Sequence, residues 1–89
     1  MDNNGAGMAR IGVVIVDDIA ETRENFSKLL MFERDIEVIG TAGSGPEAIE
    51  ICRRLHPDVV LMDINMPEMD GIKAAEIIST ELPGIGIIM

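Results

Sequence analysis

The sequence predicts an α/β fold in which a doubly wound parallel sheet carries helices on both faces. Two observations support this prediction. Short apolar runs rich in β-branched residues alternate with amphipathic segments of helical period, and Gly, Pro or polar residues separate the two kinds of segment. Strands that alternate with helices pair in parallel through right-handed crossovers. The 89 residues are enough for one small core and therefore for one domain.

Four strands and three helices are expected after a short leader. Residues 1–10 are rich in Asn, Gly and Ala and lack periodicity, so we expect them to be disordered. The predicted strands span residues 11–16, 36–39, 59–62 and 85–89. The predicted helices span residues 19–32, 45–55 and 71–82.

The first predicted strand is a continuous β-branched run, which is typical of a strand buried on both faces. The helix that follows has an apolar stripe that is expected to face the sheet: Ile19, Phe26, Leu29 and Leu30. Its polar side chains are expected to face water: Glu21, Arg23, Glu24 and Lys28.

The second predicted helix begins with a capping box, in which Ser44 accepts a hydrogen bond from an early backbone amide and Glu47 reaches back. It ends at His56, because the residue before a proline disfavours the helical conformation. Asp70 is predicted to cap the third helix, and Pro83 breaks it. Small or aliphatic side chains are expected to point inward from these two helices: Ala48, Ile51, Cys52, Leu55, Ala74, Ala75, Ile78 and Leu82.

Composition and charge argue against several classes of function. Sixteen acidic and seven basic side chains give a formal net charge of −9, which is the wrong sign for binding a nucleic-acid backbone or an anionic membrane. The longest apolar runs, of about six residues, are too short to span a bilayer. Cys52 is the single cysteine and cannot form an internal disulfide, which indicates a cytoplasmic protein.

Acidic side chains follow two of the predicted strands: Asp17 and Asp18 follow the first, and Asp63 follows the third. Ligands of open parallel sheets bind at the carboxyl ends of the strands, where these carboxylates meet if the two strands are neighbours. Two unit charges ~4 Å apart repel by ~4 kcal/mol at an effective dielectric of ~20, and a cation relieves that cost. Carboxylates without nearby His or Cys suit Mg²⁺ or Mn²⁺, and a carboxylate beside such an ion can attack a phosphoryl group.

Two motifs surround the predicted metal site. They read Val-Ile-Val-Asp17-Asp18 and Met-Asp63-Ile-Asn65-Met-Pro67-Glu-Met-Asp-Gly71. With these motifs, residues 11–89 of the chain resemble the receiver domain of bacterial two-component response regulators. The resemblance implies a flavodoxin-like doubly wound sheet of strand order 2-1-3-4, counted along the chain. It also implies a phospho-accepting module of a signal relay in the cytoplasm, whose partner is a sensor histidine kinase or a phosphotransfer protein.

The resemblance further implies roles for individual residues. Asp63 matches the phosphoacceptor of the family. Asp17 and Asp18 match the acidic pair that positions Mg²⁺ (or Mn²⁺), one of them directly. Asn65 matches the residue whose main-chain carbonyl completes the metal shell.

The chain also departs from the family pattern. Receivers normally have five strands and five helices, whereas this sequence stops in the fourth strand. The switch Ser or Thr after strand four and the Lys after strand five are not among its 89 residues, and Lys28 and Lys73 lie on predicted helices. We therefore expect residues 11–89 to be the N-terminal portion of a receiver domain, truncated after the start of strand four, in which phosphorylation is impaired.

Two other functions stay open. A truncated receiver fold can act without phosphorylation as a binding or self-assembly module, as a homodimer through the exposed edge of the strand at residues 85–89. A Mg²⁺-dependent phosphohydrolase also uses strand-end aspartates, but it needs an Asp two positions after its nucleophile as general acid, and Asn65 stands there. We therefore expect a phosphoacceptor and not an enzyme, without direct contact to nucleic acid or membrane.

Overall fold

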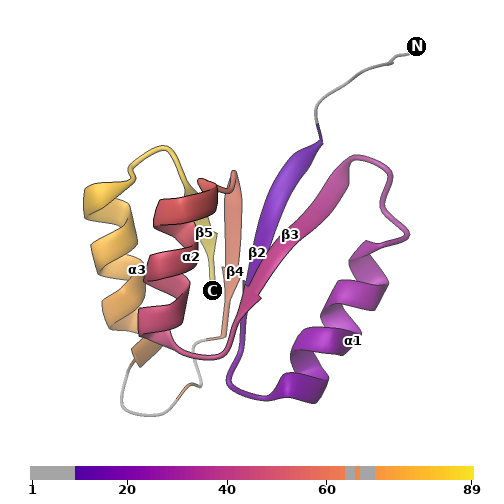
Figure 1. Cartoon of the computed structure of the whole chain (residues 1–89), viewed down its shortest axis with the longest axis horizontal. Coiled ribbons are helices and arrows are strands. Elements are labelled where there is room, and N and C mark those ends of the chain that lie inside the picture. Colours follow the sequence, from indigo (N-terminus) through magenta and orange to yellow (C-terminus); the bar gives the residue numbers. More distant parts are fainter. Residues whose placement is uncertain (1–9, 64–65, 67–69) are drawn as a thin grey trace.

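The structure is a computed structural model that describes residues 10–63, 66 and 70–89. The predicted leader lies outside the described residues, apart from Arg10. Within the described ranges, four strands alternate with three helices in the predicted order (Figure 1). The strands are β2 (Ile11–Val16), β3 (Ile36–Ala42), β4 (Val59–Met62) and β5 (Gly86–Ile88). The helices are α1 (Ala20–Leu30), α2 (Gly45–Leu55) and α3 (Asp70–Glu81).

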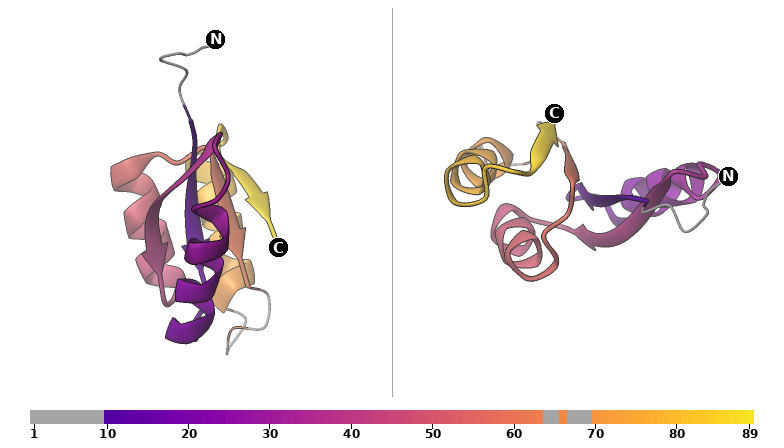
Figure 2. Two further views of the ribbon diagram at one scale, coloured as in Figure 1. Left: turned by 90° about the vertical axis from the view of Figure 1, so that its right-hand side faces the viewer. Right: turned by 90° about the horizontal axis from the view of Figure 1, so that it is seen from above.

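The strands form one parallel sheet of order β3-β2-β4-β5. Counted along the chain, this is the order 2-1-3-4 that the resemblance implies. Helices α2 and α3 lie on one face of the sheet, and α1 lies on the other (Figure 2). The predicted doubly wound α/β fold is therefore confirmed. None of the helices in the described ranges has both the length and the apolar character that a membrane crossing requires.

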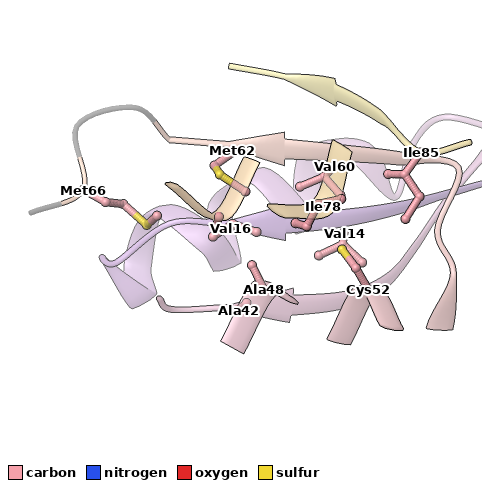
Figure 3. Packing of buried hydrophobic residues seen from close by; sticks show 11 residues of the cluster. Val14, Val16, Ala42, Ala48, Cys52, Val60, Met62, Met66, Ile78 and Ile85 are labelled. Carbon is pink, nitrogen blue, oxygen red and sulfur yellow. The ribbon is translucent and has the colours of Figure 1, made fainter. Parts of the chain in front are cut away.

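The hydrophobic core lies between the sheet and the pair α2 and α3 (Figure 3). Val14, Val16 and Val60 of the two central strands are at most 1% exposed. Ala48 and Cys52 on α2 are fully buried against them, and burial raises the pKa of the Cys52 thiol. The other members of the core cluster are Ala42, Met62, Met66, Ala74, Ile78 and Ile85. Small side chains on the helices let the helix backbones approach the sheet closely, so this face is dry and well packed.

The opposite face is covered much less well. No residue of α1 is buried, and the predicted inward stripe is wrong in this respect: Ile19, Phe26 and Leu29 are 55%, 46% and 65% exposed. Helix α1 lies over β2 and β3, where it helps to bury Val13 and Ile15, and the described residues place no second helix beside it (Figure 2). An apolar stripe that meets only half of a sheet face stays partly in water.

The boundaries of β3 and α2 differ in detail from the prediction. Strand β3 runs to Ala42, because the register shifts by one residue after Val13 and pairing with β2 then continues to the strand end. Gly40 therefore does not end the strand. Instead it lets α2 pack closely, since a Cβ there would lie 2.6 Å from Ile51 Cδ1. Leu55, predicted to point inward, is 37% exposed at the end of α2.

The two helix starts follow the predicted chemistry with one difference each. Ser44 Oγ accepts from the Glu47 amide at 3.3 Å, which confirms the predicted cap of α2. The Glu47 carboxylate reaches back to the amide of Gly43 (2.7 Å), one residue before the cap. Asp70 is the first residue of α3 instead of preceding the helix. Helix α2 ends as predicted at His56, whose left-handed conformation (φ 49°) turns the chain toward Pro57.

Candidate metal centre

Three carboxylates lie together at the carboxyl end of the sheet. Asp17 and Asp18 follow β2, and Asp63 follows β4, which is the next strand in the sheet. The register pairs Val16 with Met62, so the two strands end at the same height. One carboxylate oxygen of each aspartate lies within 4.8 Å of the others. The structure therefore brings together three of the four predicted ligands, and the fourth, Asn65, lies outside the described residues.

Backbone pairing continues beyond the strands into this cluster. The Asp17 amide donates to the carbonyl of Ala42 at 3.0 Å, and the Asp63 amide donates to the carbonyl of Val16 at 3.0 Å. Hydrogen bonds between main-chain atoms thus set the separation of the aspartates. Their side chains approach because the sheet holds their backbones, despite the repulsion between like charges.

The donor set fits a small hard cation. All three side chains offer carboxylate oxygens, which Mg²⁺ and Mn²⁺ prefer, and the cluster contains no His or Cys. Burial varies across the cluster, since Asp17 is 8% exposed, Asp63 is half-buried and Asp18 is exposed. These carboxylates would hold such a cation, which would keep several waters, as Mg²⁺ usually does.

Asp17 is held by hydrogen bonds at several of its atoms. Its Oδ1 accepts from the amide of Ile19 at 2.8 Å, which supplies an acceptor at the start of α1, where the N-cap residue Ile19 makes no side-chain cap of its own. Its carbonyl oxygen accepts from Nη1 of Arg23 at 2.7 Å. The amide, the carbonyl and one carboxylate oxygen of Asp17 are therefore all hydrogen-bonded, which fixes the orientation of the carboxylate.

The structure corrects the prediction that Arg23 faces water: the residue is half-buried and donates to the main-chain carbonyl of Asp17. Helical periodicity places it on the polar side of α1, and that signal does not separate solvated arginines from hydrogen-bonded ones. A second signal was present in the sequence. Side chains in a helix tilt toward its N-terminus, so an arginine in the first turn can reach the carbonyls that precede the helix.

Gly71 lies where α3 begins beside the end of β4. A Cβ on Gly71 would come within 2.9 Å of the carbonyl oxygen of Asp63 and 3.1 Å of Met66 Cε. A side chain at this position would therefore clash with the backbone beside Asp63, which accounts for the glycine at this point of the motif. Pro67 of the same motif lies outside the described residues.

An apolar groove of about 450 Å³ adjoins the cluster on the α1 face of the sheet. Asp17 and Asp63 line it together with Ile15, Phe26 and Leu61, and the end of the chain contributes Ile88 and Met89. Asp63 therefore belongs to the acidic cluster and also lines an apolar groove.

Comparisons with known proteins agree with one another. A family model described as response regulator receiver domain matches residues 13–89. The transcriptional regulatory protein LnrK of Bacillus subtilis (strain 168) is 39% identical over 79 residues, which make up 89% of this chain and 36% of LnrK. This chain therefore spans about a third of the length of that relative.

Solved structures give the same result. The response regulator domain of Thermotoga maritima CheB matches with a TM-score of 0.83 at 38% identity, over 90% of this chain and 59% of that domain. The CheX–CheY complex with BeF₃ and Mg²⁺ from Borrelia burgdorferi matches with a TM-score of 0.82 at 31% identity, over 91% of this chain and 61% of the matched chain.

The substitution Gly71→Ala tests the close approach beside Asp63. Ala is normally favoured over Gly within a helix by ~0.5–1 kcal/mol. The added Cβ instead meets backbone at 2.9 Å, so we expect the free energy of unfolding to fall by ~1 kcal/mol or more. Urea unfolding measures the change. Gly84→Ala is the matched control, because nothing lies within 4 Å of its Cβ and its expected change is below ~0.5 kcal/mol. Equal stability of the two variants would contradict the prediction.

Proposed function

Because the chain belongs to the response regulator receiver domain family, we propose that it accepts a phosphoryl group on Asp63 with the help of Mg²⁺ (or Mn²⁺). The convergence of Asp17, Asp18 and Asp63 within 4.8 Å at the carboxyl end of the sheet carries this proposal. The cluster combines a nucleophilic carboxylate with two further carboxylates that can hold a cation beside it.

The proposed reaction is a transfer from a phosphorylated histidine of a partner protein. An oxygen of the Asp63 carboxylate attacks phosphorus, and the new O–P bond forms as the P–N bond breaks. The electron pair of that bond stays on the imidazole nitrogen of the partner, which takes up a proton from solvent. The product on Asp63 is an acyl phosphate. The chain is thus a phosphoacceptor and not an enzyme with a turnover of its own.

Each residue of the site has a distinct proposed role. Asp17 and Asp18 hold the cation, and Asp17 is oriented for this by the Ile19 amide. Asn65 is proposed to add its main-chain carbonyl as a ligand. The bound cation supplies positive charge next to the oxygens of the group being transferred. The match to a complex that contains BeF₃ and Mg²⁺ supports this use of the acidic cluster.

The proposed partner is a sensor histidine kinase or a phosphotransfer protein, and the proposed compartment is the cytoplasm. Residues 11–89 are proposed to form the N-terminal portion of a receiver domain, since they cover 59% of the matched response regulator domain. The excess of acidic residues, with a net charge of −9, argues against direct contact of this chain with nucleic acid.

Weak, millimolar Mg²⁺ or Mn²⁺ binding is the first expected result. Few protein oxygens contact the ion and it keeps several waters, so affinity is low. Chemical-shift or calorimetric titration measures the binding, and both Asp17→Asn and Asp63→Asn are expected to abolish it. Asp35→Asn removes the same charge from an exposed turn and should leave binding intact. Unchanged affinity in Asp63→Asn would show that the pocket is misassigned.

Phosphorylation of Asp63 is expected to be slow in these 89 residues tested by themselves. Both of their lysines are exposed on helices, Lys28 on α1 and Lys73 on α3. We therefore expect neither lysine to donate to the phosphoryl group during its transfer. One donor aimed at the developing charge is typically worth ~3 kcal/mol, or about a hundredfold in rate. Incubation with an acyl phosphate and Mg²⁺, followed by mass spectrometry, should show an acid-stable, alkali-labile phosphoryl adduct at low yield. Rapid labelling, or labelling that persists in Asp63→Ala, would refute this prediction.

Self-association is a second proposed function, and the edge of the sheet favours it. Strand β5 lies at the end of the strand order and contains neither a charge nor a proline. Such an edge presents open backbone groups to another strand. On this strand, Ile88 is 58% exposed and lines the apolar groove. We propose a homodimer that pairs two β5 edges and covers both grooves.

The dimer is expected at micromolar concentration and above, and sedimentation measures it. Ile87→Lys should shift the chain to monomer or unfold it, because Ile87 also packs against the core. Ile88→Lys is the cleaner variant, since this side chain is exposed, and it should give a folded monomer. Phe32→Lys adds the same charge at an 87% exposed site after α1 and should leave the dimer intact. A wild-type chain that stays monomeric at high concentration would refute the proposal.

A further inference from the structure

Arg23 links the acidic pair to the loop that opens α2. It lies in the first turn of α1, and its Nη1 donates to the carbonyl of Asp17 at 2.7 Å. The same nitrogen lies 2.9 Å from the point where a Cβ on Gly43 would be, and the guanidinium carbon lies 3.6 Å from it. The guanidinium therefore rests against the backbone of Gly43, which has no side chain to exclude it.

Gly43 is also held by Glu47. Its amide donates to the Glu47 carboxylate at 2.7 Å, which ties the loop to the first turn of α2. The preceding residue, Ala42, receives the amide of Asp17 on its carbonyl at 3.0 Å. The loops after β2 and β3 are thus joined twice, once by a main-chain hydrogen bond and once by the side chain of Arg23.

We infer that Arg23 is a positioning residue for the acidic cluster: its guanidinium, seated on Gly43, fixes the backbone of Asp17 so that the Asp17 and Asp18 carboxylates face Asp63. The inference rests on the proposed metal site and deepens it. A planar guanidinium suits this role because it can lie flat against a backbone while one of its N–H groups donates to a carbonyl. The proposed ligand atom of Asp17 is a carboxylate oxygen, whereas Arg23 contacts its carbonyl, so Arg23 acts through the residue that it holds.

The charge of Arg23 makes the inference testable. A guanidinium beside a cation site repels the cation, so removing its charge alone should strengthen Mg²⁺ binding. Removing its hydrogen bond should weaken binding, because Asp17 is then less well oriented. The two effects have opposite signs. Groups that orient metal ligands typically contribute about tenfold or more to affinity.

The experiment compares the wild-type chain with Arg23→Ala, Arg23→Lys and Gly43→Ala. Mg²⁺ titration should show affinity about tenfold weaker in Arg23→Ala, despite the lost repulsion. Gly43→Ala keeps the charge but displaces the guanidinium, and it should weaken binding similarly. Arg23→Lys should give intermediate affinity. Lys28→Ala is the matched control, since it removes one positive charge from an exposed site on α1 and should bind as tightly as wild type or more tightly.

A second measurement in the metal-free chain keeps the inference separate from the proposed function. The amide of Ile19 donates to the carboxylate of Asp17, so its hydrogen exchange reports the order of that residue directly. Exchange at Ile19 should accelerate in Arg23→Ala and Gly43→Ala, while the buried amides of Val14 and Val60 keep their wild-type rates. This pattern also excludes general unfolding as the cause.

Two outcomes would overturn the inference: unchanged exchange at Ile19 in Arg23→Ala, or Mg²⁺ affinity in that variant at or above the wild-type value. A wild-type chain that binds no Mg²⁺ would refute the proposed function alone. In that case faster exchange at Ile19 in both variants would still establish that Arg23 orders Asp17.

Discussion

The parallel pairing of β2 with both β3 and β4 is the constraint on which the rest of the structure depends. Because all three strands run in the same direction, their carboxyl ends lie at one edge of the sheet, where loops collect polar groups. The pairing does not stop at the strand ends. It continues through the amides of Asp17 and Asp63, so the hydrogen bonds that define the fold also set the geometry of the site.

This arrangement explains how three negative charges remain close together. If only side-chain contacts positioned these carboxylates, they would move apart to reduce their mutual repulsion. Here main-chain hydrogen bonds on a buried strand hold two of the aspartates, and β2 is anchored by Val14 and Val16 in the core. The main chain therefore fixes where the carboxylates lie, and a cation bound between them, as proposed, would offset their repulsion.

The two faces of the sheet differ in how well helices cover them. On one face, α2 and α3 pack against the strands and bury an aliphatic core. On the other, α1 covers β2 and β3 with a helix that has no buried residue, and an apolar groove remains beside Asp63. The well-packed face supplies stability, whereas the other face leaves Asp63 beside an open apolar groove.

The sequence determined much of this structure. Alternating strand and helix patterns predicted the elements, and the residues that follow the strands predicted where the chemistry lies. The signals were local and strong: β-branched runs for β2 and β4, a capping box at Ser44, and aspartates at two strand ends. The distance between Asp17 and Asp63 depended on strand order, which the resemblance to receivers supplied and residue spacing did not.

The tertiary structure alone decided which amphipathic surfaces are covered. The stripe of α1 has the same periodicity as that of α2, yet Phe26 is 46% exposed whereas Cys52 is fully buried. Periodicity reports which side of a helix is apolar, but burial depends on what another part of the chain places opposite that side. The same reason applies to one contact of Arg23. Its place in the first turn of α1 allows it to reach the nearby carbonyl of Asp17, but its contact with the backbone of Gly43 depends on where the tertiary structure places the end of β3.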